Sequence, residues 1–289
     1  MTIDVGTLGA TAGPRLVRWT DRDTLLYALG VGAGPEDLSL VTENSHGIRQ
    51  QVLPTFAVIV APGFDVLPKL GKVSFSRMLH GAQEIRVHRP LPPAGELSVV
   101  SEIADIQDKG EGKNAIVTLA GRGSDPATGE LVAETFTTLV FRGQGGFGGK
   151  PGERAKPVEI PYRAPDAQYD EPTDERLPLI YRLTGDRNPL HSDPWYAREK
   201  AGFPRPIMHG LCTYGIAGRA LVAGLCDGDA SKISAMSARF TAPVFPGERL
   251  ITSIWRTGER TAVFRTEACG TDGSNRRIVL DNGQAELHP

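Results

Sequence analysis

Residues 179–191 read LIYRLTGDRNPLH, and this stretch decides how the rest of the chain is interpreted. An apolar, helix-like segment ends at a glycine, and the turn that follows carries a carboxylate, an amide and an imidazole on Asp186, Asn188 and His191. Pro189 removes a backbone donor and biases the residue before it away from helical conformation, which favours a turn. A carboxylate and an imidazole on one tight turn are suited to moving protons.

A second element lies a short distance along the chain, where Gly210 opens an apolar segment of small residues at 210–223. The first N–H groups of a helix have no partner inside it, and they carry the positive end of its dipole. They suit the oxygen of a carbonyl group that gains negative charge during a reaction. An acid/base pair beside such donors predicts a hydro-lyase, which adds or removes water next to a carbonyl.

Both elements also have a purely structural explanation. Asp186 and Asn188 are common turn residues, and a single histidine usually has no catalytic role. Gly210 is equally explained by a tight entry into a helix. Residue spacing therefore leaves the catalytic and the structural interpretation open.

Composition narrows the class of protein. The chain has 289 residues, a net charge of −2 and no lysine- or arginine-rich run, so we expect neither a nucleic-acid partner nor membrane insertion. Three cysteines without C-x-x-C spacing favour a reducing compartment over a disulfide framework. The first residues show no basic and apolar leader, so we expect a cytoplasmic location.

A weak internal repeat organises the chain. Residues 86–97 (RVHRPLPPAGEL) are echoed by residues 239–250 (RFTAPVFPGERL), and each copy reads as a strand, a Pro/Gly turn and a strand. The runs predicted as further strands are 97–106, 114–122, 131–141, 250–256, 262–268 and 277–287. We therefore predict an α+β unit used twice, with a first domain at 1–150, a Gly/Pro-rich linker at 151–170 and a second domain at 171–289.

The two halves differ in the residues that follow a His-Gly pair. His209 is separated from Arg239 by 29 residues, which include the apolar helix, whereas His80 is separated from Arg86 by only five. The short gap in the first half has no room for such a helix, and the absence of a helix there could leave a cavity for a long apolar ligand. The alternative is a first-half helix placed earlier, around residues 55–62.

Other chemistries find little support in the sequence. A G-x-G-x-x-G pattern at 143–148 is followed by Gly149-Lys150-Pro151-Gly152, which cannot open a helix, so the dinucleotide-binding interpretation fails. No serine lies in a G-x-S-x-G pattern, and no His or Cys pair has metal-ligand spacing. We expect neither a metal ion nor an organic cofactor.

These features together resemble the MaoC-like hydratases, and most closely the (R)-specific enoyl-CoA hydratases called hydratase 2. The segments that carry the resemblance are residues 79–81, 108–110, 145–150, 181–194, 201–203, 206–213, 239–240 and 243–247. The resemblance implies a double hot-dog fold, in which two antiparallel sheets each wrap around a central helix. The first unit would bind the acyl chain and the second would carry the catalytic residues.

The resemblance also implies roles for individual residues. Asp186 and His191 would be the catalytic pair, with Asn188 positioning them, and the backbone N–H of Gly210 would receive the thioester oxygen. The residues that would line the CoA ester site are His80, Gly81, Lys109 and Phe240. The activity would be reversible syn addition of water to trans-2-enoyl-CoA, giving (3R)-hydroxyacyl-CoA, in fatty acid metabolism. Pro178 departs from the family pattern and would shorten the helix before the site.

Two other functions stay open at this level. A hot-dog acyl-CoA thioesterase would use a similar carboxylate and helix N-terminus to hydrolyse the thioester. A non-catalytic acyl-CoA-binding subunit would be expected to have a degraded Asp-x-Asn-Pro-x-His motif in both halves, whereas the second copy is intact. Exposed sheet edges in paired hot-dog units make a homodimer plausible.

Overall fold

The structure is a computed structural model that describes residues 3–153 and 156–289. Its described strands form one antiparallel sheet in the order β1-β3-β4-β5-β2-β7-β10-β9-β8-β6. The strands are β1 (Thr11–Trp19), β2 (Met78–Val87), β3 (Gly95–Asp108), β4 (Ala115–Ser124), β5 (Leu131–Phe141), β6 (Ala167–Pro172), β7 (Ile233–Phe240), β8 (Arg249–Arg256), β9 (Thr261–Cys269) and β10 (Arg277–Leu287). The two halves of the chain meet where β2 pairs with β7.

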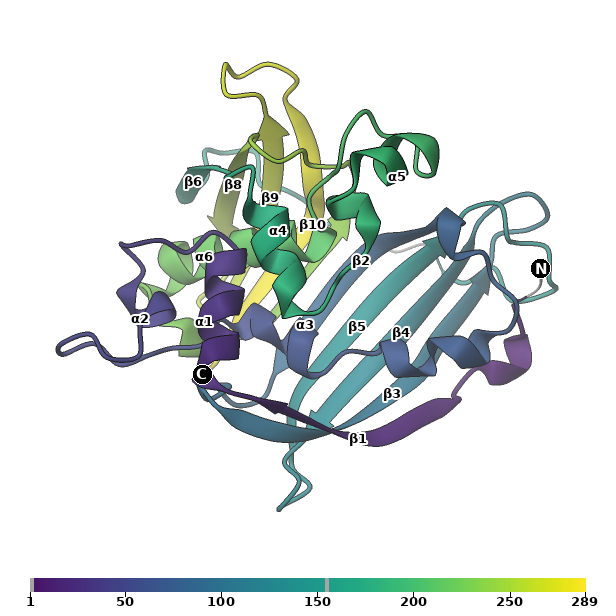
Figure 1. The fold of residues 1–289 in the computed structure, drawn as a ribbon, viewed down its shortest axis with the longest axis horizontal. Helices are drawn as coiled ribbons and strands as arrows, with labels where there is room; N and C mark the ends of the chain where they lie inside the picture. Colours follow the sequence, from purple (N-terminus) through teal and green to yellow (C-terminus); the bar gives the residue numbers. More distant parts are fainter. Residues whose placement is uncertain (1–2, 154–155) are drawn as a thin grey trace.

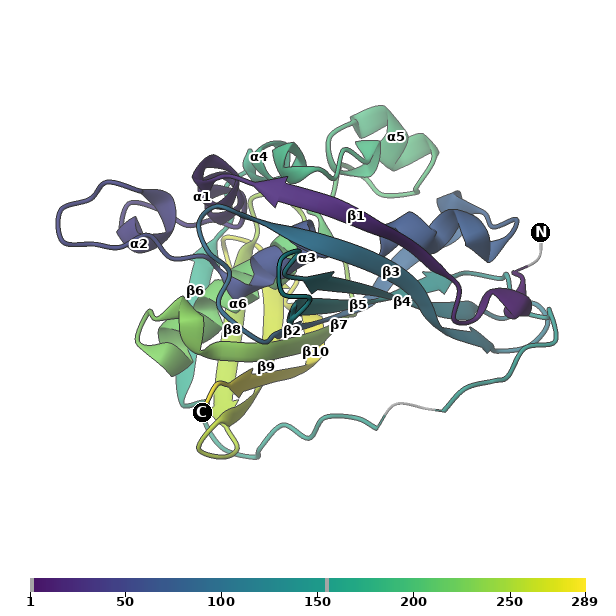
Figure 2. The ribbon, with the colours of Figure 1, turned by 90° about the horizontal axis from the view of Figure 1, so that it is seen from below.

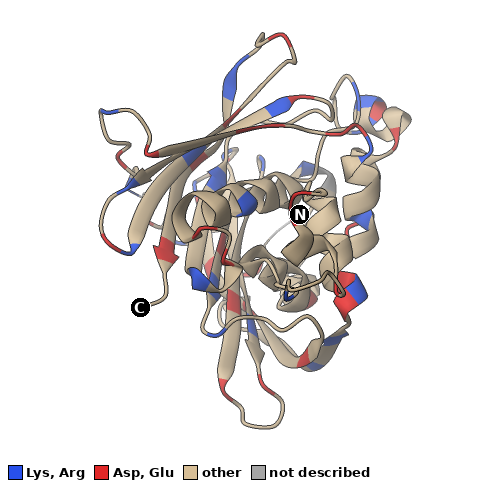
Figure 3. Ribbon diagram, turned by 90° about the vertical axis from the view of Figure 1, so that its left-hand side faces the viewer, with Lys and Arg blue, Asp and Glu red and all other residues tan. Residues whose placement is uncertain are grey.

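The helices lie mostly before the strands of each half. They are α1 (Asp21–Gly30), α2 (Leu38–Val41), α3 (Ala57–Val60), α4 (Leu177–Tyr181), α5 (Pro194–Glu199) and α6 (Gly210–Cys226). Figure 1 shows β1 to β5 as one broad, curved sheet, with α1, α4 and α6 gathered beside it and α5 near the top. Along the ribbon in Figure 3, positions of Lys and Arg alternate with positions of Asp and Glu. Among the described residues, no helix is long and apolar enough to span a membrane.

The six runs predicted as further strands are present, as β3, β4, β5, β8, β9 and β10. Two edge strands were not expected. β1 contains Gly13 and Pro14, which interrupt an alternating pattern. β6 begins inside the predicted linker, because residues 167–170 pair with β8, so the linker ends earlier than predicted. Residues 154–155 of that linker lie outside the described residues.

The long helix α6 is the core of the second unit. Twelve of its 17 residues are buried. It also packs closely on the first half, since a Cβ atom at Gly215 would lie 2.4 Å from Val31 Cγ1, and one at Gly218 would lie 2.6 Å from Thr55 Cγ2. These two glycines let the helix approach segments of the other half. One hydrophobic core therefore runs through both units.

The first unit has no equivalent of α6 among its described residues. The earlier helix that the sequence left open is present, but it consists of a 3-10 turn at Pro54–Phe56 and the single turn of α3. The first unit therefore has its helix at the earlier place that the sequence left open, and this helix is much shorter than α6. Pro54 and Pro62 bracket this segment, and a proline restricts the residue before it, which prevents a longer helix.

An ion-pair cluster ties α6 to both halves. The guanidinium of Arg219 lies 2.7 Å from a carboxylate oxygen of Asp37 and 2.9 Å from one of Glu171. Burial raises the pKa of Glu171 above its ordinary value, and the nearby guanidinium opposes that shift. Removing Arg219 would leave two carboxylates facing each other without a cation.

Candidate active site

The turn that carries the acidic residue begins at a glycine. α4 is followed by a 3-10 turn (Arg182–Thr184) and then by Gly185, whose φ of 136° is strained for any residue with a side chain. The sequence predicted that Pro178 shortens the preceding helix, and α4 has only five residues with this proline in its first turn. That position lacks an intrahelical acceptor in any case, so the proline is tolerated there.

Asp186 and Asn188 shape this turn through their side chains. The Asn188 N–H donates to Asp186 Oδ1 at 3.1 Å. The Asn188 side-chain oxygen accepts from the Leu190 N–H at 3.0 Å and caps the 3-10 turn Pro189–His191. The structural interpretation of Asn188 is therefore correct, and its effect is to hold Asp186 and His191 on one side of the turn. Asp186 is exposed and faces a cavity.

His191 is buried and has a defined tautomer. Its Nδ1 lies 2.9 Å from the carbonyl oxygen of Ile207. A carbonyl only accepts hydrogen bonds, so Nδ1 carries a proton and the neutral ring presents a lone pair at Nε2. Burial lowers the pKa of His191 below its ordinary value. The side chain is consequently a neutral acceptor at physiological pH.

His209 is a third polar residue of the site, and the sequence did not single it out. Its ring stacks on that of His191, with centroids 3.8 Å apart and an interplanar angle of 28°. Its Nε2 lies 3.1 Å from the backbone oxygen of Asp186. Burial is the main cause that lowers the pKa of His209 to about 4. Its place directly before Gly210 was the available signal.

Asp186, His191 and His209 lie close enough to be considered as metal ligands, with one candidate donor atom of each within 4.8 Å of the others. The stacking argues against this role. An imidazole nitrogen binds a metal at about 2.0–2.1 Å along a lone pair that lies in the ring plane. Two nearly parallel rings 3.8 Å apart cannot both direct such lone pairs at one ion. The cluster suits proton transfer better than metal binding.

Gly210 begins α6, as the sequence predicted. The N–H groups of Cys212 and Thr213 donate to the carbonyl of His209. The N–H groups of Gly210 and Leu211 have no acceptor within the described residues, so they are available to a ligand. A Cβ atom at position 210 would lie 3.2 Å from the Phe240 ring, which makes glycine the residue that fits here.

A cavity of about 690 Å³ opens onto these groups. Asp186, Asn188, His191 and Gly210 line one part of it. The apolar lining comes from both halves and includes Val58, Ile59, Pro62, Leu79, Leu139, Ile207, Leu211, Phe240, Val244 and Val279. The first half, which lacks a long helix, thus contributes the wall of an apolar cavity beside α3.

The other predicted ligand-binding residues are divided by the structure. His80 lines the cavity from β2, and its ring lies 4.7 Å from that of Phe240, which lines the cavity too. Burial lowers the pKa of His80 to about 4. Gly81 lies at an irregularity between β2 and β5 and is not a lining residue. Lys109 is not one either, and its ammonium group donates to the carbonyl of Pro151.

The glycine-rich segment after β5 has an internal partner. The carboxylate of Asp108 accepts hydrogen bonds from the backbone N–H groups of Gly110, Gly146, Gly148 and Gly149. These bonds, that of Gly146 most strongly, lower the pKa of Asp108 to about 2. The G-x-G-x-x-G segment therefore wraps a carboxylate of the protein itself, which agrees with the rejection of a dinucleotide site.

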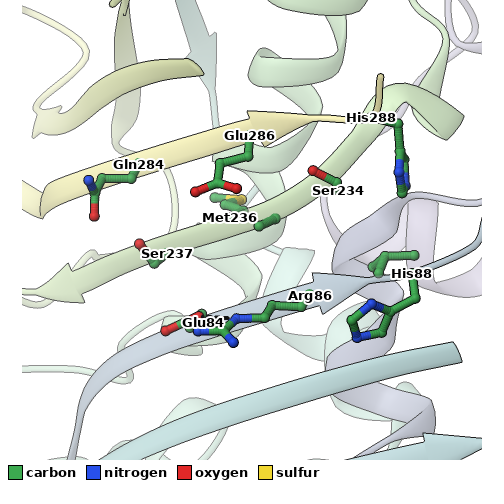
Figure 4. A pocket seen from close by; sticks show the side chains of 11 residues that line it. Glu84, Arg86, His88, Ser234, Met236, Ser237, Gln284, Glu286 and His288 are labelled. Carbon is green, nitrogen blue, oxygen red and sulfur yellow. Dashed lines mark hydrogen bonds and ion pairs between the residues drawn. The ribbon is translucent and has the colours of Figure 1, made fainter. Parts of the chain in front are cut away.

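A second hollow, of about 640 Å³, lies on the opposite face of the sheet. Figure 4 shows it along β2, β7 and β10, with Glu84, Arg86 and Glu286 among its polar side chains. Ile85, between two of these residues, points into the core, so the hollow faces away from the catalytic cavity. Glu84 and Arg86 form an ion pair with each other.

Comparison with known proteins identifies the family of this chain. A family model described as a MaoC like domain matches residues 157–275, and one described as the MFE-2 hydratase 2 N-terminal domain matches residues 18–143. A 3-hydroxyacyl-thioester dehydratase of Mycobacterium tuberculosis (strain ATCC 25618 / H37Rv) is 64% identical over 99% of both chains. The chain belongs to the MaoC-like dehydratase family. It is accordingly a hydro-lyase, as the sequence predicted.

A plant enzyme and a solved structure are also similar to this chain. The peroxisomal enoyl-CoA hydratase 2 of Arabidopsis thaliana is 39% identical over 86% of this chain and 85% of its own. A solved MaoC-like dehydratase from Phytophthora Capsici superposes with a TM-score of 0.84 at 30% identity, covering 99% of this chain and 98% of the other. The double hot-dog fold predicted from the sequence is thereby confirmed.

Proposed function

We propose that this member of the family catalyses reversible syn addition of water to trans-2-enoyl-CoA, giving (3R)-hydroxyacyl-CoA. The observation that carries the proposal is the convergence of Asp186, His191 and the free N–H of Gly210 at one apolar cavity. The names of the relatives, a 3-hydroxyacyl-thioester dehydratase and an enoyl-CoA hydratase 2, support the same substrate class.

The helix N-terminus activates the substrate in this proposal. The thioester oxygen accepts a hydrogen bond from the Gly210 N–H, which draws electrons from the double bond and makes C3 electrophilic. Negative charge that develops on this oxygen lies at the positive end of the α6 dipole. A preorganised donor of this kind is typically worth about 3 kcal/mol of transition-state stabilisation.

The acid/base pair handles the water. The Asp186 carboxylate and the lone pair at His191 Nε2 are both acceptors, so together they hold the two hydrogens of one water molecule. Asp186, assigned as the base, removes one proton while the oxygen attacks C3. Asp186 then returns that proton to C2 on the same face, while His191 keeps the hydrogen bond that its Nε2 accepts from the new C3 hydroxyl; in dehydration the same steps run backwards. These steps account for every atom of the water and the substrate, so the proposed reaction includes no metal ion and no organic cofactor.

The apolar wall from the first half would hold the acyl chain. Lys109 lies outside this cavity and donates to the carbonyl of Pro151, and we propose that the other N–H donors of its ammonium group contact a CoA phosphate. We also propose a cytoplasmic homodimer, in which edge strand β1 or β6 is available for pairing. Light scattering of the purified protein tests the homodimer, and a monomer at working concentration would exclude it.

The direct test is incubation of the purified protein with short-, medium- and long-chain trans-2-enoyl-CoA esters. We expect loss of the conjugated enoyl absorbance, (3R)-hydroxyacyl-CoA on chiral analysis and no free thiol. His191→Ala is the matched inactive variant. Release of free CoA thiol would instead support a thioesterase, and unchanged esters with every chain length would support a binding subunit.

A further inference from the structure

His209 contacts three separate parts of the candidate site. Its ring stacks on His191 at 3.8 Å, and its Nε2 lies 3.1 Å from the backbone oxygen of Asp186. Its own carbonyl accepts the first two N–H bonds of α6, so it is the N-cap residue of the helix that presents Gly210. His209 therefore contacts the backbone of Asp186, the imidazole of His191 and the first turn of the helix that presents the Gly210 N–H.

Hydrogen bonding determines the protonation state of this ring. Nε2 faces a carbonyl oxygen, which only accepts, so Nε2 carries the proton. Nδ1 is buried and has no partner among the described atoms, and the residue is only 1% exposed. A second proton at Nδ1 would create a buried cation without an acceptor.

The groups around the ring are consistent with a neutral imidazole. His191 and Asp186 face it from the turn, Tyr181 packs on it from α4 with ring centroids 4.9 Å apart, and Arg182 is the nearby cation. Arg182 and a protonated His191 would both repel a charged His209. The charged form is favoured by Asp186, through its exposed carboxylate and through the hydrogen bond that its backbone oxygen accepts, but burial outweighs both and lowers the pKa of His209.

We infer that His209 is a positioning residue for the proposed hydration, a neutral imidazole that holds the ring of His191 and the backbone of Asp186 in register with the Gly210 N–H. This inference rests on the proposed function. Because His209 is buried behind the reacting groups, it acts through them and does not touch the substrate. A shift of about 1 Å in such a pair lowers the rate by roughly 100-fold.

Two variants distinguish the effect of the hydrogen bond that His209 donates from the effect of the volume that its ring fills. His209→Phe keeps a flat buried ring but removes the donor to Asp186, whereas His209→Gln keeps an N–H donor at a similar reach. We expect His209→Phe to lower kcat by roughly 10- to 100-fold with little change in KM. We expect His209→Gln to recover most of that loss. Thermal unfolding of both variants reports whether they fold.

A folded His209→Phe protein with the wild-type kcat would overturn the inference. So would a folded His209→Gln protein with a kcat as low as that of His209→Phe, because the donor would then not matter.

A measurement on the wild-type protein needs no substrate and uses the variants only to assign one signal. Nitrogen NMR of histidine-labelled protein, assigned through the loss of one signal in His209→Gln or His209→Phe, should show the neutral Nε2–H tautomer for His209 from about pH 5 to pH 8. An imidazolium form within that range would overturn the inference. Because this readout requires no turnover, it stays informative even if the wild-type protein does not hydrate enoyl-CoA, which would overturn the proposed function alone.

Discussion

The two His-Gly pairs of this chain have the same sequence and opposite surroundings. His80-Gly81 lies inside β2, where the imidazole lines the cavity and the glycine sits at an irregularity of the sheet. His209-Gly210 lies at the start of α6, where the imidazole is buried and the glycine N–H is free. A helix after the dipeptide, and not the dipeptide itself, creates a site for an oxyanion.

The helices explain the division of labour between the halves. α6 fills its own unit and meets the cavity at its N-terminus, whereas the single turn of α3 contributes an apolar wall to the cavity. Phe240 lies between the two His-Gly pairs, because its ring packs on His80 and lies against Gly210. The comparison predicts that chemical defects arise from the second half and chain-length defects from the first.

The largest expected effect is that of Asp186→Asn. Removing the base from the second half should lower kcat by roughly 10²- to 10⁴-fold while the fold is retained, since Asp186 is exposed. Steady-state hydration of enoyl-CoA measures it. Asp193→Asn makes the same chemical change nearby, at a helix cap where asparagine is also favourable, and should be close to wild type. Near wild-type activity of Asp186→Asn would end the assignment.

The next effect concerns the first half. Ile59→Trp adds bulk to the apolar wall, so kcat/KM for long-chain esters should fall by roughly tenfold or more while short-chain esters react nearly as before. Leu131→Trp, at an exposed position outside the cavity lining, is the control. An equal loss at every chain length would show that the first half does more than hold the chain.

Acid stability probes both halves at once. Burial lowers the pKa values of His80 and His209 to about 4, and it lowers that of His191 too. As the pH falls below about 6.5, these residues therefore bind protons less readily in the folded protein than in the unfolded chain. The unfolded chain binds protons below about pH 6.5, so stability is full above that pH and falls as the pH drops toward 4. Thermal unfolding should therefore shift downward by several degrees on acidification.

Two variants check the origin of that shift. His209→Gln should reduce the dependence of the melting temperature on pH, because it removes one such group from the second half. His46→Gln, at an exposed position, should leave the dependence unchanged. If both variants behaved alike, buried histidines would not be its cause.

The smallest effect is expected for Lys109→Ala. Its ammonium group binds the carbonyl of Pro151 outside the cavity, so any phosphate contact would be a surface interaction worth at most about 1 kcal/mol. The KM for enoyl-CoA should rise up to about fivefold without a change in kcat. Lys113→Ala, on the same exposed loop, is the comparison, and an identical response of both variants would remove any specific role for Lys109.

Sequence reasoning succeeded where a residue acts through local geometry. The strand-like runs identified β3, β4, β5, β8, β9 and β10, and the apolar run after Gly210 identified α6. It failed for β1 and β6, since edge strands tolerate proline and polar residues that resemble a linker. His209 was missed because its partners, at Asp186 and His191, become neighbours only through the fold.

The pairing of β2 with β7 has a consequence for how this protein could be encoded. Five residue pairs between these strands and the packing of α6 on the first half join the units without the connector, which Figure 2 shows running along the outside between β5 and β6. None of the described residues of that connector, 142–153 and 156–166, lines the cavity, so the connector keeps the two halves close together without forming the site. Two separate genes, each encoding one half, could therefore yield the same enzyme as a heterodimer.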